Sequence, residues 1–324
     1  MTSLGIPVVP PPTPDPTWKQ AWDAALYGPD GFFRREAPAQ HFRTSVHASP
    51  LFAQALLGMT REAGLDTVVD IGAGRGELLA QLHALDPRLD LLGVEVASRP
   101  VGLDESIAWT TALPDSVEGL VVANEWLDDI PCHVAEVAED GRLRVVHVDR
   151  ATGAESLGQP LDHASVPASL AAWVERWWPL DSREPGTRAE VGTTRDTAWA
   201  DVVARVTRGI AVAVDYGHLR EDRPAFGSLR SYRAGQEVDV LPDGSRDVTA
   251  HVAVDAVADR VGGELLRQRD VLRALGVSGE RPDLARATSD PAGYVRALVT
   301  ATEAAELTAP GGLGDFWWVV SVTD

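Results

Sequence analysis

Short runs of β-branched and other apolar residues alternate with helical patterns from residue 65 onward, and this alternation restricts the possible folds more than any other feature. Apolar residues at helical spacing separate some of the runs, such as Leu78, Leu82 and Leu85, which Pro87 follows. Buried strands that alternate with helices are typical of a parallel, doubly wound α/β sheet. The predicted strands are residues 67–71 (TVVDI), 90–96 (DLLGVEV), 119–124 (GLVVAN), 210–216 (IAVAVDY) and 316–322 (FWWVVSV), with a shorter one near 107–110.

The first part of the chain has a different character from the rest. Residues 1–60 form a proline-rich arm and N-terminal helices, with six of the 22 prolines between residues 7 and 16. Prolines at this density have fixed φ angles and few amide donors, which favours an extended segment. Helices are predicted at about residues 18–26 and 50–64, where apolar side chains recur at helical spacing.

Residues 61–324 are expected to form one α/β domain with two insertions. Residues 134–200 contain a predicted hairpin that turns at Asp140-Gly141, followed by a polar region with tryptophans. Residues 218–250 are rich in Gly, Pro, Arg and Asp. Both stretches interrupt the alternation of strands and helices. We expect them at the C-terminal edge of the sheet, where such folds bind ligands.

The composition argues against several function classes. The chain has 29 basic and 48 acidic residues, a net charge of −19, which disfavours binding to nucleic acids or anionic membranes. The single cysteine, Cys132, excludes an intrachain disulfide and a multi-cysteine zinc site. No apolar run approaches the roughly 20 residues that span a bilayer. Since the N-terminus also lacks the basic start of a signal peptide, we expect a cytoplasmic protein.

The strongest local motif is DIGAGRG, residues 70–76. The first strand ends near Asp70, and Gly72, Gly74 and Gly76 can form a sharp loop that lets a ligand lie against the backbone. Glu95 lies 25 residues after Asp70, near the end of the next strand, where a carboxylate can accept hydrogen bonds from both ribose hydroxyls. This order predicts a nucleoside site; the alternative is that the glycines only form a tight turn.

The residue after the loop helps to identify the nucleoside. The dinucleotide fingerprint GxGxxG requires glycine where this chain has Glu77. A carboxylate there competes with a pyrophosphate for the N–H groups of the helix. S-adenosyl-L-methionine contains adenosine but no phosphate, and its sulfonium and ammonium groups favour carboxylates such as Asp70. We therefore expect this cofactor and a class I methyltransferase fold, a Rossmann-like doubly wound sheet.

A second motif follows the strand at 119–124 and reads NEWLDDIP, residues 124–131. It resembles the NE–aromatic–aromatic–DALP segment of the MidA-like methyltransferases, a family that includes a mitochondrial complex I assembly factor. The resemblance implies a methyltransferase and assigns Asn124 to cofactor binding together with the glycine loop and Glu95. Similar blocks follow in family order at residues 213–219 (AVDYGHL), 229–233 (LRSYR), 247–252 (DVTAHV) and 307–319 (LTAPGGLGDFWWV).

The chain also departs from the family pattern. The TAPE block of the family is replaced by Thr44, Ser45, Val46 and His47, which lack its proline and glutamate. In the second motif, the second aromatic residue becomes Leu127 and the alanine becomes Asp129. These changes lie where we expect the methyl acceptor to bind.

The mitochondrial family member methylates protein arginine, which implies a protein substrate that carries an arginine, such as a respiratory-complex subunit. Paired carboxylates can hold a guanidinium and offset its charge. Glu125 and Asp128 are spaced i, i+3, which places them on one face of a helical turn, and Asp129 is the alternate second acid. His251 is a candidate base or orienting residue.

Other interpretations remain open. The acids can instead cap a helix or face solvent, and His251 can form a structural hydrogen bond. The acceptor can be a small molecule, or the protein can be a non-catalytic cofactor-binding assembly factor. No histidine–carboxylate spacing indicates a metal site.

Overall fold

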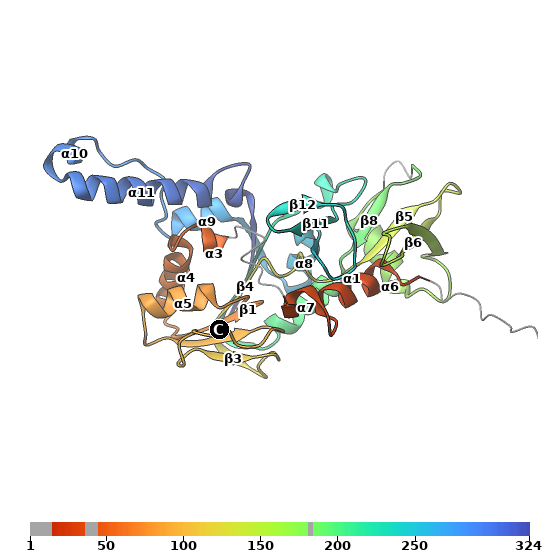
Figure 1. Cartoon of the computed structure of the whole chain (residues 1–324), viewed down its shortest axis with the longest axis horizontal. Helices are drawn as coiled ribbons and strands as arrows, with labels where there is room; N and C mark the ends of the chain where they lie inside the picture. Colours follow the sequence, from red (N-terminus) through yellow and green to blue (C-terminus); the bar gives the residue numbers. More distant parts are fainter. Residues whose placement is uncertain (1–14, 36–44, 181–183) are drawn as a thin grey trace, which may run out of the picture.

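The main sheet has seven strands in the order β15-β16-β9-β4-β1-β2-β3. Its strands β1, β3 and β4 are labelled in Figure 1. The computed structural model describes residues 15–35, 45–180 and 184–324. The strands are β1 Thr67–Ile71, β2 Asp90–Val94, β3 Ala108–Thr110, β4 Val117–Asn124, β9 Val206–Asp215, β15 Glu264–Arg267 and β16 Trp317–Thr323. All six predicted strands are therefore present, and together they form one sheet.

The α/β prediction is confirmed, with two differences. β1 pairs in parallel with β2 and β4, but β16 runs antiparallel to both β9 and β15. The apolar pattern of a buried strand does not encode its direction, so the all-parallel expectation is wrong for β16. The pattern also does not predict β15, whose four residues are exposed or only partly buried.

Helices cover both faces of the sheet because its strands are apolar on both sides. Val68 and Val122 belong to one buried cluster, whereas Val69 and Val121 belong to the opposite one. Successive side chains of a strand point to opposite faces, so each strand needs a cover on both. One face carries α4 Leu51–Glu62, α5 Glu77–Leu85, α9 Gln268–Ala274 and α11 Pro291–Thr308; the other carries α7 Thr193–Val203 and α8 Val254–Val261.

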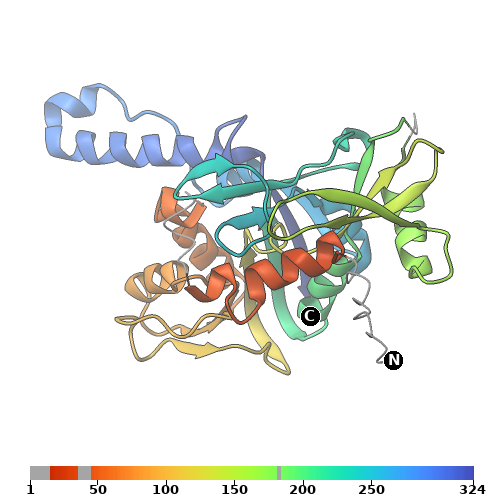
Figure 2. The same cartoon turned by 45° about the vertical axis from the view of Figure 1, so that its right-hand side comes forward.

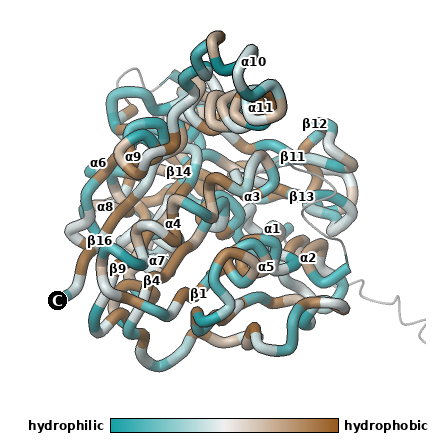
Figure 3. The backbone as a smooth tube through the Cα atoms, turned by 90° about the vertical axis from the view of Figure 1, so that its left-hand side faces the viewer, coloured by the Kyte–Doolittle hydropathy of each residue, from teal (hydrophilic) through white to brown (hydrophobic). Residues whose placement is uncertain are grey.

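The apolar strands are visible in the middle of the fold when the tube is coloured by hydropathy (Figure 3). At one end of the molecule α10 Ala285–Ser289 packs on α11, and the end of α11 that carries α10 projects away from the sheet, whereas Ala304 and Leu307 near its other end belong to the core (Figures 1 and 2). Within the described residues, no helix combines the length and apolarity that a membrane crossing requires.

A smaller four-stranded antiparallel sheet lies beside the main one (Figure 2). Its hairpin turns at Asp140-Gly141 as predicted, and Gly141 has a φ of 73°, which suits glycine. Helix α1 packs across this sheet, with Trp18 and Trp22 in one buried cluster with Val134. The elements are β5 His133–Val137, β6 Leu143–Val148, β7 Glu155–Pro160, β8 Arg188–Val191, α6 Ala168–Trp177 and α1 Trp18–Tyr27.

Several short elements complete the described fold. A three-stranded sheet in the order β12-β11-β13 occupies part of the stretch 218–250. These elements are α2 Phe32–Arg35, α3 Ser45–Ala48, β10 Gly217–His218, β11 Arg230–Arg233, β12 Gln236–Val238, β13 Asp247–Thr249 and β14 Val252–Ala253.

The two N-terminal helices follow the predicted bounds closely, as α1 and α4. The proline-rich stretch 7–16 lies almost entirely outside the described residues. In the stretch 134–200, helix α7 packs against the main sheet, where Trp199 is completely buried. Because α7 packs on the main sheet, we propose that it belongs to the main domain and that the first insertion ends at β8. The second insertion, at 218–250, also remains a proposal.

Candidate functional site

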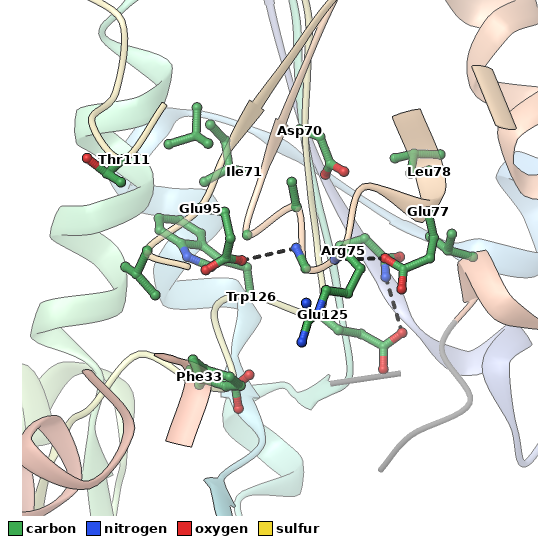
Figure 4. Close-up of a pocket in the computed structure, with 18 of the residues that line it drawn as sticks. Phe33, Asp70, Ile71, Arg75, Glu77, Leu78, Glu95, Thr111, Glu125 and Trp126 are labelled. Carbon is green, nitrogen blue, oxygen red and sulfur yellow. Dashed lines mark hydrogen bonds between the residues drawn. The ribbon is translucent and has the colours of Figure 1, made fainter. Parts of the chain in front are cut away.

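A cavity of about 260 Å³ lies at the carboxyl ends of β1, β2 and β4 (Figure 4). Open α/β sheets bind ligands at this edge. From the main sheet, the lining includes Asp70, Gly72, Gly74, Arg75, Glu77, Glu95, Asn124, Glu125, Trp126 and Asp129. From the N-terminal segment, it includes Tyr27, Phe33, Val46 and His47.

The glycine loop adopts a backbone that other residues rarely accept. Gly72, Gly74 and Gly76 have φ angles of 72°, 56° and 77°. A Cβ atom on Gly72 would lie 2.7 Å from Cδ1 of Trp126, so the indole packs directly on the loop. Gly72 and Gly74 line the cavity, whereas Gly76 does not and forms the N-cap position of α5. The structure thus places two of the three predicted glycines at the cavity surface.

Glu95 lies on the other side of the glycine loop from α5 and is hydrogen-bonded to the loop. Its carboxylate accepts a hydrogen bond from the backbone N–H of Gly74 at 3.0 Å (Figure 4). It accepts a second one from the backbone N–H of Ala97 at 3.2 Å. Burial raises the pKa of Glu95 despite these bonds. A carboxylate held in this way can also accept hydrogen bonds from the two hydroxyls of a ribose.

Asp70 and Asn124 add polar groups to the same cavity. Asp70 is 4% exposed, and burial followed by the nearby charges of Glu95 and Glu77 raises its pKa well above the usual value. Asn124 donates from Nδ2 to Oε1 of Glu125 at 3.2 Å, while its buried Oδ1 has no partner among the described residues. A ligand with N–H donors or positive charge would stabilise both groups.

Glu125 has an unusual backbone. Its φ is 51°, a left-handed value that costs energy for a residue with a side chain. Its carboxylate accepts hydrogen bonds from the backbone N–H of Ser45 at 3.3 Å and from Asn124. Burial, followed by the charge of Asp128, raises the pKa of Glu125 to about 7. Strained residues cluster at functional sites, and this one faces the cavity.

The backbone after Glu125 shows that the predicted helical turn is wrong. It forms a bend and a turn rather than a helix, so Glu125 and Asp128 do not share a helical face. Asp128 does not line the cavity; its Oδ2 accepts hydrogen bonds from the hydroxyls of Tyr216 at 2.5 Å and Thr249 at 2.7 Å. Asp129, the alternate acid, lines the cavity instead. The i, i+3 argument fails because it assumes helical geometry that the strained turn does not have.

Asp129 is strongly affected by its surroundings. Burial raises its pKa well above the usual value, and the charge of Asp128 adds to the shift. Its Oδ1 is buried and has no partner among the described residues. Such an atom is stabilised by a ligand that brings a donor or a positive charge.

His251 lies outside the cavity lining. Its ring meets the ring of Tyr216 edge to face at a centroid distance of 5.1 Å, and its backbone oxygen accepts a hydrogen bond from Arg195 at 2.9 Å. Through Tyr216, His251 is linked to Asp128, which itself lies outside the cavity lining.

The N-terminal segment contributes residues that the motifs do not predict. The rings of Tyr27 and Phe33 lie 5.6 Å apart, and the Tyr27 hydroxyl donates to the backbone oxygen of Asp129 at 3.2 Å. No local pattern indicates that these residues reach the cavity. His47 belongs to the block that replaces TAPE, and this difference from the family pattern is the sequence feature that pointed to this side of the cavity.

Comparisons with known proteins agree with this geometry. Two crystal structures from Burkholderia thailandensis, both members of one superfamily, cover 95% of this chain and 87% of their own chains. One is a "likely methyl transferase" bound to S-adenosyl-homocysteine, with 26% identity and a TM-score of 0.72. The other, an uncharacterized protein, has 25% identity and a TM-score of 0.74. No curated protein matches the chain.

A family model also matches residues 80–268, and its description is "Putative S-adenosyl-L-methionine-dependent methyltransferase". The matched residues are more than half of the chain and include the strand that leads to Glu125. They exclude the glycine loop and the N-terminal wall of the cavity, so the cavity is built partly from residues outside the match. The chain belongs to this S-adenosyl-L-methionine-dependent methyltransferase family.

Proposed function

We propose that this chain is a MidA-like enzyme that transfers a methyl group from S-adenosyl-L-methionine to an arginine of a protein substrate. The observation that carries the proposal is that the glycine loop, Glu95 and Glu125 line one cavity. The relative from Burkholderia that binds S-adenosyl-homocysteine supports the cofactor. The resemblance of the NEWLDDIP segment to the MidA-like family supports the acceptor.

The residues of the cavity fit the cofactor. Glu95 offers a carboxylate to the ribose hydroxyls, and the bare backbone of Gly72 and Gly74 allows close approach. The raised pKa of Asp70 and the unpartnered Oδ1 of Asn124 fit the positive and N–H-bearing groups of the cofactor. When bound, the cofactor supplies an electrophilic methyl group on a sulfonium sulfur.

The other wall suits a cationic acceptor. A guanidinium is charged at neutral pH and is a poor nucleophile, so it needs carboxylates that orient it and offset its charge. Glu125 and Asp129 both line the cavity and can do this, whereas Asp128 is a positioning residue that acts through Tyr216 and Thr249. His251 has at most a similar indirect role, through its contact with Tyr216.

The reaction needs one proton acceptor. A new N–C bond forms as the S–C bond breaks, the sulfur becomes a neutral thioether, and the methylated nitrogen loses one proton. With a pKa of about 7, Glu125 is partly ionised at neutral pH and can take that proton. Its strained backbone holds the carboxylate at the cavity rather than in solvent.

The test combines binding and turnover. Isothermal titration should detect S-adenosyl-homocysteine binding and no comparable affinity for NAD. Mass spectrometry should find arginine methylation that disappears in a deletion strain and returns with the wild-type gene but not with Glu125→Gln. Binding without any methylated product would instead favour a non-catalytic assembly factor, and methylation of small amines alone would favour a small-molecule enzyme.

A further inference from the structure

An ion pair joins the N-terminal segment to the start of α5 inside the cavity. Nε2 of His47 lies 3.5 Å from Oε1 of Glu77, with 27% and 28% of the two side chains exposed. Both residues line the cavity. The other carboxylate oxygen of Glu77 accepts a hydrogen bond from the backbone N–H of Arg75 at 2.9 Å, which anchors the pair to the glycine loop.

Each member of the pair stabilises the charge of the other. The hydrogen bond with Glu77 raises the pKa of His47, and the charge of Glu125 adds to this effect, although burial opposes it. Burial acts to raise the pKa of Glu77, but hydrogen bonds from His47 and from backbone N–H groups outweigh it, so the net shift is downward. When His47 is protonated, the cavity presents a positive and a negative group side by side.

The pair lies at the opposite side of the cavity from Glu95, the acid proposed to bind the ribose. Figure 4 shows Glu77 and Glu95 on either side of the pocket, with the loop that carries Arg75 between them. If the ribose binds at Glu95, as proposed above, an amino-acid end that extends along the glycine loop reaches the side of the pocket where Glu77 lies. That end is a zwitterion, with one ammonium and one carboxylate.

The carboxylate of this zwitterion is the only anionic group of the cofactor, and the cavity is otherwise unfavourable for it. Five of the described lining residues are acids: Asp70, Glu77, Glu95, Glu125 and Asp129. Among the described lining residues, His47 and Arg75 are the two that can carry positive charge. The charge of Arg75 acts on Glu95, on the ribose side, which leaves His47 for the amino-acid end.

We propose that His47 and Glu77 form a recognition site for the α-amino acid of the cofactor, with His47 binding the carboxylate and Glu77 the ammonium. The proposal rests on the cofactor proposed above and extends it to two residues. Each ligand charge then meets an opposite protein charge, as charge-assisted hydrogen bonds require. The site also gives the N-terminal segment a direct role in cofactor affinity.

Two ligands separate this role from a general effect on the pocket. S-adenosyl-homocysteine carries the amino acid, whereas 5′-methylthioadenosine shares the adenosine and the thioether but lacks it. In isothermal titration, His47→Gln and Glu77→Gln should each weaken S-adenosyl-homocysteine binding about tenfold, about 1.4 kcal/mol, and change methylthioadenosine binding less than about twofold. The matched control is His83→Gln, because His83 lies on α5 and pairs with Asp104 at 3.6 Å outside the cavity lining.

Three outcomes would contradict the proposal. Equal weakening of both ligands by His47→Gln would mean that His47 only shapes the wall. If Arg75→Gln selectively weakens S-adenosyl-homocysteine binding and His47→Gln does not, Arg75 rather than His47 binds the carboxylate of the ligand. If the wild-type protein does not bind S-adenosyl-homocysteine, although circular dichroism shows that it is folded, the proposed cofactor itself is wrong. This outcome differs from the other two, in which the wild type still binds the ligand.

Discussion

The wall of the cavity formed after β1 and β2 differs from the wall formed after β4 in how it holds its acids. Glu95 is held by backbone N–H groups of its own loop and of the adjacent glycine loop. Glu125 has a strained backbone and is held by Ser45 from the N-terminal segment. The first wall is built from neighbouring strands, and the second depends on segments distant in sequence.

This difference suggests separate functions for the two walls. An acid with fixed hydrogen bonds and glycines around it suits a ligand that always binds in the same way. On the second wall, Asp129 has a buried oxygen without a partner among the described residues, and Glu125 is buried on a strained backbone with a raised pKa. Such acids are costly until a cationic partner arrives. We therefore expect changes in the first wall to affect cofactor affinity and changes in the second to affect turnover.

The largest effect is expected from Glu125→Gln. The variant keeps the shape of the side chain but removes the charge proposed to hold the acceptor and the group proposed to take its proton. The methyl-transfer rate should fall by a factor on the order of 10² or more, a few kcal/mol of transition-state stabilisation. The affinity for S-adenosyl-homocysteine should change less than about twofold. Wild-type turnover in this variant would assign Glu125 a structural role.

Glu95→Ala should produce the reverse pattern. It removes a charged acceptor for the ribose hydroxyls, and cofactor binding should weaken by roughly 1.5–3 kcal/mol. Isothermal titration measures the loss directly, and at saturating cofactor the methyl-transfer rate should recover. If the affinity is unchanged, the acid at this position does not contact the ribose.

The pH dependence of the rate tests the second wall. Because burial raises the pKa of Glu125 to about 7, its ionised form is lost as the pH falls through that value. Below about pH 7 the rate should therefore fall about tenfold per pH unit. The residual activity of Glu125→Gln should not show this dependence. An identical profile in the variant would mean that another group controls the rate.

A smaller effect is expected from the packing of the glycine loop. Gly72→Ala forces a left-handed alanine and places its Cβ against Trp126. Gly102→Ala meets only the backbone cost, because Gly102 has a φ of 88° and no atom of the described residues lies within 4 Å of the place that a Cβ would take. Gly72→Ala should lower the free energy of unfolding by about 1 kcal/mol more than Gly102→Ala. Denaturant unfolding measures both, and equal values would show that Trp126 moves aside freely.

Much of the first wall could be predicted from sequence because its residues are close along the chain. Strand, glycine loop, helix and acid follow one another between residues 67 and 95, and the parallel pairing of β1 and β2 brings them together. Local apolar periodicity and the φ requirement of glycine are sufficient to predict this arrangement. The antiparallel direction of β16 and the presence of β15 are not encoded in such local patterns.

The second wall depended on contacts that no local pattern contains. The choice between Asp128 and Asp129 was set by the turn at Glu125, whose φ of 51° cannot be inferred from the letters NEWLDDIP. Tyr216 and Thr249 then hold Asp128 away from the cavity, although they lie 88 and 121 residues further along the chain.

The sequence by itself determined the α/β fold, the glycine loop and the position of Glu95 across from it, because short-range periodicity and backbone preferences specify them. Only the tertiary structure decided which acids line the cavity after β4 and that Tyr27, Phe33 and His47 also line it. The physical reason is that burial and charge act through space. A carboxylate acquires its environment from every segment packed around it, and those segments meet only when the chain has folded.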